Sequence, residues 1–198
     1  TIRFYMAYVS PVWTPLRFDM VGLKESYSKY YATFKNAYSF FEMYANADNI
    51  DPREYDIKVE DRELIDKWLL SKLNKLVRDV INAYEEYDLN KVVKLIVPFL
   101  NDDLSNWYIR SNRRRFWDSK LTKSKKSVYQ TTYEVLVTLA KLTAPITPYI
   151  SDEIYTKLTG EESVHLADFP KFNENLVNEE VEEKMDLVRD ICSLGRDA

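Results

Sequence analysis

The residues best suited to binding an anion are gathered in one stretch, Asp102–Trp117. Its first half is apolar and aromatic, with Leu104, Trp107 and Tyr108 at the i, i+3, i+4 spacing of one helical face. The second half is basic and contains Arg110, Arg113, Arg114 and Arg115. A helix that buries one face and presents arginines on another can hold phosphate groups through charge-assisted hydrogen bonds. The pattern therefore predicts a helix that docks on a phosphate backbone.

The distribution of charge favours the same interpretation. The net charge of −4 excludes a uniformly basic nucleic-acid binder. Between Arg110 and Lys126, however, eight residues are lysine or arginine and only Asp118 is acidic. Because the field depends on where charges lie, this segment can attract anions within a net-acidic protein. The alternative is a solvated arginine surface that pairs with some of the chain's many carboxylates.

The composition excludes several kinds of catalytic and metal site. The 198 residues include three glycines, too few for a glycine-rich phosphate loop and the turns it needs. The single cysteine, Cys192, and the single histidine, His165, exclude an internal disulfide and a Cys/His zinc site. We expect His165 to be structural or incidental and Cys192 to be a small core residue. The chain's own residues therefore predict no catalytic residue and no metal site.

Other sequence features indicate the cellular setting. No apolar run reaches the about 18 residues of a membrane span, and the N-terminus lacks the pattern of a signal peptide. With the low cysteine content, this favours a cytoplasmic protein without a membrane partner. The sequence starts at Thr1, without methionine and already inside an amphipathic pattern, so we expect a piece of a longer protein. We expect that piece to be a monomer.

Helices must position the basic stretch, because apolar residues recur with helical spacing along nearly the whole chain. A proline-containing loop at residues 10–15 interrupts the pattern, and we expect Trp13 to be buried there. Pro98 should kink the helix that leads into the basic stretch or remove one of its backbone hydrogen bonds. Residues 119–127 are predicted to be a polar, lysine-rich loop. The predicted helices span residues 2–9, 20–45, 61–84, 89–117, 128–143, 149–158 and 178 onward.

These elements predict an all-α protein built as an up-and-down helical bundle. We assign residues 1–17 to the end of a helix and its connecting loop, 18–158 to the bundle, and 159–198 to an acidic C-terminal extension. Within that extension a short strand-like segment, 163–170, precedes the C-terminal helix. An aromatic stripe between Tyr27 and Tyr44 is expected to lie in the core, although such residues can also stack on unpaired bases.

Four segments, in this order, carry a resemblance to a known family: Asp103–Arg110, Asn112–Trp117, Tyr133–Tyr155 and Ser163–Pro170. They resemble the anticodon-binding helical domain of the isoleucyl-tRNA synthetase family, a class Ia aminoacyl-tRNA synthetase. The resemblance covers essentially the whole chain. Valyl and leucyl relatives share the helix break at Ala144 and Pro145 but differ around Trp107, which favours isoleucine.

The resemblance implies a function. The complete enzyme, isoleucine--tRNA ligase, would use ATP to attach isoleucine to its tRNA and would hydrolyse mischarged valine in an editing domain. This chain resembles neither of those parts, and residues 1–17 would follow the catalytic domain. It lacks the ATP-binding signatures and the cysteine cluster that binds zinc in the C-terminal region of many members. It should have no cofactor of its own, contact the remaining domains of the same chain, and bind isoleucine-specific tRNA along the anticodon stem.

The resemblance and the charge pattern together suggest a set of tRNA-binding residues. The arginines should contact phosphates, Asn112 should donate hydrogen bonds nearby, and the lysines should add a weaker field. Trp117 can stack on a base, although packing in the core is the favoured role. The expected set is Arg110, Asn112, Arg113, Arg114, Arg115, Trp117, Lys120, Lys123, Lys125 and Lys126.

Two other functions are weighed against tRNA binding. A helical protein–protein interaction module would expose Tyr30, Tyr31, Phe34 and Tyr38 as one patch. A stand-alone enzyme would need a concave pocket with perturbed acids or bases. The tRNA-binding function is favoured if those aromatic residues are buried while Arg110–Arg115 project together into solvent.

Overall fold

The computed structural model describes residues 1–11 and 13–197, and every regular element within them is helical. Val12, in the predicted loop, and Ala198, at the end of the predicted extension, lie outside these residues. No helix in the described part is both long enough and apolar enough to cross a membrane. The α-helices are α1 (Ile2–Val9), α2 (Met20–Ser26), α3 (Thr33–Asp48), α4 (Leu64–Glu85), α5 (Leu89–Pro98), α6 (Arg110–Trp117), α7 (Lys123–Thr143), α8 (Pro148–Thr159) and α9 (Glu179–Asp197).

Two π-helical segments join α-helices end to end. Segment η1 (Tyr27–Ala32) connects α2 to α3, and η4 (Phe99–Ile109) connects α5 to α6. The helices predicted over 20–45 and 89–117 are therefore continuous rods, as expected. Short 3-10 turns lie at Pro52–Glu54, Val59–Asp61, Val164–Leu166 and Glu174–Leu176.

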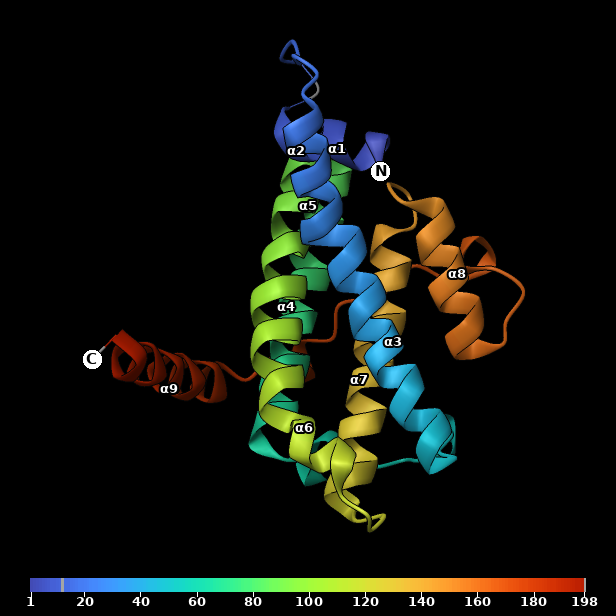
Figure 1. Cartoon of the computed structure of the whole chain (residues 1–198), viewed down its shortest axis with the longest axis vertical. Coiled ribbons are helices and arrows are strands. Elements are labelled where there is room, and N and C mark those ends of the chain that lie inside the picture. Colours follow the sequence, from blue (N-terminus) through green and yellow to red (C-terminus); the bar gives the residue numbers. More distant parts are fainter. Residues whose placement is uncertain (12, 198) are drawn as a thin grey trace.

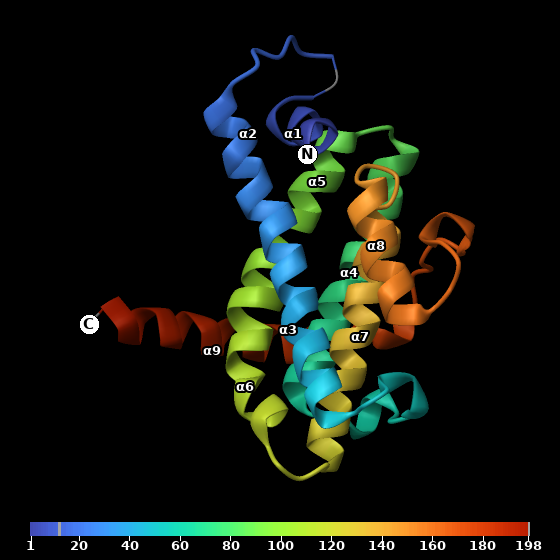
Figure 2. The same cartoon turned by 45° about the vertical axis from the view of Figure 1, so that its right-hand side comes forward.

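Four long rods lie side by side and alternate in direction (Figure 1). They are α2–η1–α3, α4, α5–η4–α6 and α7, so the predicted up-and-down bundle is confirmed. Helix α8 packs beside α7, and α1 crosses the end of the bundle opposite to α6 (Figure 2). Helix α9 projects away on the side opposite to α8. The domain boundaries at residues 17 and 158 stay predictions.

The aromatic stripe faces the core. Tyr30, Phe34 and Tyr38 are buried, whereas Tyr31 is only partly buried. The hydroxyl of Tyr30 lies 2.8 Å from the hydroxyl of Thr147, and burial raises the pKa of Tyr30 to about 12. These residues therefore do not form the contiguous exposed patch that the protein–protein interaction module requires.

The two π-helical segments contact each other at Asn101. Its side-chain amide donates to the carbonyl oxygens of Lys29, at 2.7 Å, and Val97, at 2.8 Å. Its amide oxygen accepts from the Thr33 hydroxyl at 3.0 Å. Irregular helical turns leave backbone carbonyls in need of donors, and Pro98 has no N–H to offer. Where a kink or a lost backbone bond was predicted at Pro98, the rod continues as a π-helical segment that starts at the next residue.

Three local predictions are wrong. Trp13 is 72% exposed, because its loop extends beyond the end of the bundle (Figure 1). Segment 163–170 is not strand-like and contains a 3-10 turn, because the Asp152 carboxylate accepts hydrogen bonds from the Ser163 hydroxyl and the Val164 N–H. Half of the predicted lysine-rich loop is helical, because the Thr122 hydroxyl caps α7 and starts it at Lys123.

Helix α9 is attached to the bundle only along its first half. Arg189 forms an ion pair with Asp103, and its guanidinium lies 5.4 Å from the ring centroid of Trp68 and 5.6 Å from that of Trp107. Beyond this contact the helix leaves the bundle, so Cys192 is exposed and is not the core residue we expected. Its exposed apolar residues are Leu187, Val188, Ile191 and Leu194.

A fully buried carboxylate holds α6 in place. Asp66, in the first turn of α4, accepts two hydrogen bonds from the Arg115 guanidinium, both at 2.8 Å. It also accepts from the hydroxyls of Tyr108, at 2.6 Å, and Ser127, at 2.9 Å. Burial and the nearby Asp66 carboxylate raise the pKa of Tyr108. One side chain thereby joins α4, η4, α6 and α7.

We predict that Asp66→Ala lowers the free energy of unfolding by about 3–5 kcal/mol, because it leaves the buried Arg115 charge and the Tyr108 hydroxyl without their partner. Urea unfolding followed by circular dichroism measures this change. As a control, Arg114→Ala removes an exposed charge from the same helix and should change stability by no more than about 0.5 kcal/mol. Equal, small effects of the two substitutions would contradict the structural role of Asp66.

Candidate nucleic-acid interface

Helix α6 presents three arginines to solvent, Arg110, Arg113 and Arg114. Within the part of the chain that the structure describes, their side chains have no hydrogen-bond or ion-pair partner. Lys120, just beyond the helix, is also exposed. We call these four residues the α6 basic surface. Cations at the C-terminal end of a helix also complement its dipole, which favours this placement.

Trp117 ends α6 and connects it to α3. Its indole N–H donates to the Tyr44 hydroxyl at 2.6 Å, while 57% of the residue remains exposed. The core packing that we favoured for Trp117 is therefore not what the structure shows. Because residues four apart share a helix face, Arg113 lies beside this exposed indole. Trp107, by contrast, is partly buried against Met185 of α9.

Three residues of the expected set point into the protein. The Arg115 side chain is 12% exposed and is held by Asp66. Asn112 is buried and donates to the Tyr108 carbonyl at 2.8 Å. Lys125 is buried, with its ammonium 2.7 Å from the Asp48 carboxylate. A charge removed from water must be paired, so these side chains stabilise the fold and are not part of the α6 basic surface.

The remaining two lysines lie near the surface but have neighbours. The ammonium of Lys123 is 3.3 Å from an Asp61 carboxylate oxygen, and both side chains are exposed. The ammonium of partly buried Lys126 lies 5.2 Å from the centroid of the Tyr55 ring. Because exposed ion pairs are weak and exchange readily, these lysines can still contribute to a local positive field.

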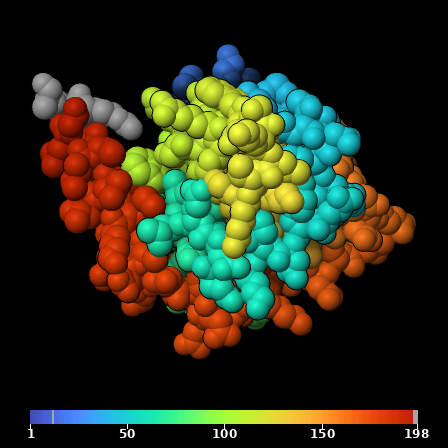
Figure 3. Space-filling model, turned by 90° about the horizontal axis from the view of Figure 1, so that it is seen from below, coloured from blue at the N-terminus to red at the C-terminus, as the bar shows by residue number. Residues whose placement is uncertain are grey.

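The shape and charge around α6 suit a large anion. Seen from below, α6, its loop to α7 and the end of α3 form an outward bulge instead of a deep pocket (Figure 3). Among the acids near α6, Asp103 forms an ion pair with Arg189 and Glu63 lies 3.6 Å from the Arg115 guanidinium, whereas Asp118 at the end of α6 is exposed. Burial raises the pKa of Asp103, and Arg189 opposes that shift. The four cations of the α6 basic surface therefore outnumber the exposed Asp118 carboxylate beside them, which leaves a local excess of positive charge.

The sequence did not predict two residues that bind side chains of α6. They are Asp66, the partner of Arg115, and Tyr44, the partner of Trp117. Asp66 had a detectable signal, because it lies three residues before Leu69 on the apolar face of a predicted helix. A lone acid on such a face requires a buried partner. Tyr44 had none, because its contact with Trp117 joins residues 73 positions apart.

Comparison with known proteins identifies a family and several relatives. The family model described as the anticodon-binding domain of tRNA ligase matches residues 66–198. An isoleucine--tRNA ligase of Bacteroides thetaiotaomicron is 44% identical over 98% of this chain and 17% of that protein. One of Clostridium tetani is 40% identical over 99% of this chain and 19% of that protein. The chain thus spans about a sixth to a fifth of the length of these relatives.

A solved structure shares the fold. The LeuRS of Agrobacterium radiobacter K84, in a ternary complex with tRNA and LeuAMS, superimposes with a TM-score of 0.61 at 17% identity. The match covers 89% of this chain and 20% of that one. The helical fold and the family match over most of the sequence lead to one conclusion: the chain belongs to the family of anticodon-binding domains of tRNA ligases.

Proposed function

We propose that this chain is the anticodon-binding domain of an isoleucine--tRNA ligase, and that its α6 basic surface docks on phosphates of isoleucine-specific tRNA. The observation that carries the proposal is that Arg110, Arg113 and Arg114 are exposed and unpaired within the described residues, on a helix fixed by a buried ion pair. The isoleucine--tRNA ligases similar to this chain, and the fold shared with a tRNA-bound LeuRS, support the choice of partner.

Electrostatics explains why exposed arginines suit this partner. Each phosphate contact releases counterions from the RNA, and the entropy of that release drives binding. Arginines already paired with carboxylates would first have to give up those partners, whereas the α6 basic surface has none to lose. Phosphate contacts set orientation but do not read bases. The surface should therefore position the anticodon stem.

The proposal assigns other functions to other regions of a longer enzyme. That enzyme would attach isoleucine to tRNA with ATP, and any zinc would bind in its C-terminal region. In this chain we propose no catalytic residue and no cofactor. It would act in the cytoplasm as one domain of a single chain, with residues 18–158 as the tRNA-binding bundle and the flanking segments leading to neighbouring domains.

We predict that combined Arg113→Ala and Arg114→Ala substitutions weaken tRNA binding and reduce the slope of log affinity against log salt by about one to two units. Filter binding of transcribed isoleucine tRNA over a range of salt concentrations measures both quantities. Combined Lys94→Ala and Lys171→Ala substitutions are the control, because they remove the same charge from exposed sites outside α6. A large fall in melting temperature with unchanged tRNA affinity would show that the arginines are structural.

The same variant tests whether these arginines read bases. Because phosphates are common to all tRNAs, we predict that the double substitution lowers affinity for isoleucine tRNA and for an unrelated tRNA by the same factor. Competition binding with the two transcripts measures this ratio. A loss restricted to isoleucine tRNA would instead place base recognition on Arg113 or Arg114.

A further inference from the structure

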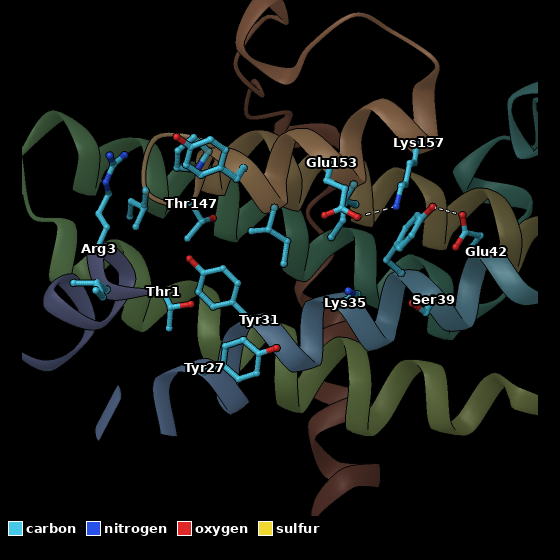
Figure 4. Close-up of a pocket in the computed structure, with 17 residues that line it drawn as sticks. Thr1, Arg3, Tyr27, Tyr31, Lys35, Ser39, Glu42, Thr147, Glu153 and Lys157 are labelled. Carbon is cyan, nitrogen blue, oxygen red and sulfur yellow. Dashed lines mark hydrogen bonds and ion pairs between the residues drawn. The ribbon is translucent and has the colours of Figure 1, made fainter. Parts of the chain in front are cut away.

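A groove of about 820 Å³ runs between η1–α3 on one side and α8 on the other (Figure 4). Tyr27, Tyr31 and Lys35 line the first wall, and Tyr149 lines the second. Arg3 of α1 lies at one end of the groove. Unlike the α6 basic surface, this site is concave, and it is lined by both aromatic rings and cations.

The aromatic rings of the groove are available to a ligand. Tyr149 is 90% exposed and Tyr27 is 51% exposed. The rings of Tyr27 and Tyr31 are nearly parallel, with an interplanar angle of 8° and centroids 5.8 Å apart. Exposed aromatic faces in a concave site are suited to a flat, unsaturated group.

The charge of the groove favours an anionic ligand. Of its two carboxylates, Glu153 lies 2.8 Å from the Lys157 ammonium, whereas Glu42 accepts a hydrogen bond from the neutral Tyr38 hydroxyl and keeps its charge. Lys157 lowers the pKa of Glu153 and so keeps that ion pair charged. Arg3 and Lys35 are exposed and have no ion-pair partner within the described residues. These two cations outnumber Glu42, the one lining carboxylate that is not in an ion pair among the described residues, so the groove has a net positive charge.

Helix α3 connects the groove to the α6 basic surface. Its Lys35 lines the groove, while the rings of its Phe40 and Tyr44 pack on Phe116 of α6, with centroids 5.0 and 6.2 Å away. Both views of the fold show α3 between α6 and α8 (Figures 1 and 2). An extended molecule that lies on α6 and crosses α3 would therefore reach the groove.

We propose that this groove binds an unpaired nucleotide of the tRNA that docks on α6. The base stacks on Tyr149, the most exposed of the three tyrosine rings named above, and the flanking phosphates lie near Arg3 and Lys35. An unpaired base can turn its face to a tyrosine ring, whereas a base in a duplex is already stacked on its neighbours. This inference rests on the proposed function, because it needs the same RNA on the neighbouring surface.

Tyr149→Ala is the direct test, because so exposed a side chain can be removed without disturbing the fold. We expect its affinity for isoleucine tRNA to fall about 5- to 100-fold with no change in salt slope, and Tyr149→Phe to bind as the unsubstituted chain does. Lys35→Ala should instead reduce the salt slope by about 0.7. Tyr87→Ala is the matched control, since Tyr87 is 85% exposed and lies outside the groove.

A second probe separates this inference from the proposed function. The chain should bind single-stranded octauridylate more tightly than an RNA duplex of eight base pairs, and Tyr149→Ala should remove that preference. If Tyr149→Ala behaves like Tyr87→Ala while the Arg113 and Arg114 substitutions still weaken tRNA binding, the groove proposal is wrong and the proposed function stands. If the unsubstituted chain binds no tRNA even at low salt, both are overturned.

Discussion

The rest of the structure depends on the need to pair one buried negative charge. Asp66 has no contact with water, so it requires donors, and Arg115, Tyr108 and Ser127 supply them from three further elements. This requirement turns one side of α6 inward. The next arginine along the chain, Arg114, consequently faces outward. The same residue type thus forms a buried ion pair at one position and presents its charge to solvent at the next.

Much of the fold could be predicted, because it depends on local periodicity. Helical spacing of apolar residues placed the long rods and the buried aromatic stripe, and the helix predicted over 149–158 corresponds to α8, which Gly160 ends with a φ of +74°. The candidate site was predictable only in part. Lys125 is buried and Lys123 is exposed, although both belong to one lysine run. The difference arises from Asp48, which is distant in sequence, and local patterns carry no information about such partners.

The structure also suggests how one helical bundle can serve two kinds of RNA contact. The α6 basic surface is convex and has charges without partners, which suits the regular backbone of a stem. The groove beside α8 is concave and aromatic, which suits a single base. Helix α3 lines the groove and packs on Phe116 of α6, so the core packing of α3 sets the relative position of the two sites.

The central claim is that α6 lies on the anticodon stem. It is tested most directly by tethering an iron chelate to α6 and mapping where hydroxyl radicals cleave bound isoleucine tRNA. Ser111→Cys offers an exposed attachment point, and Cys192→Ala removes the native thiol. The account predicts cleavage concentrated in the anticodon stem and lost at high salt. Cleavage confined to another arm of the tRNA, or spread evenly over all arms, would contradict it.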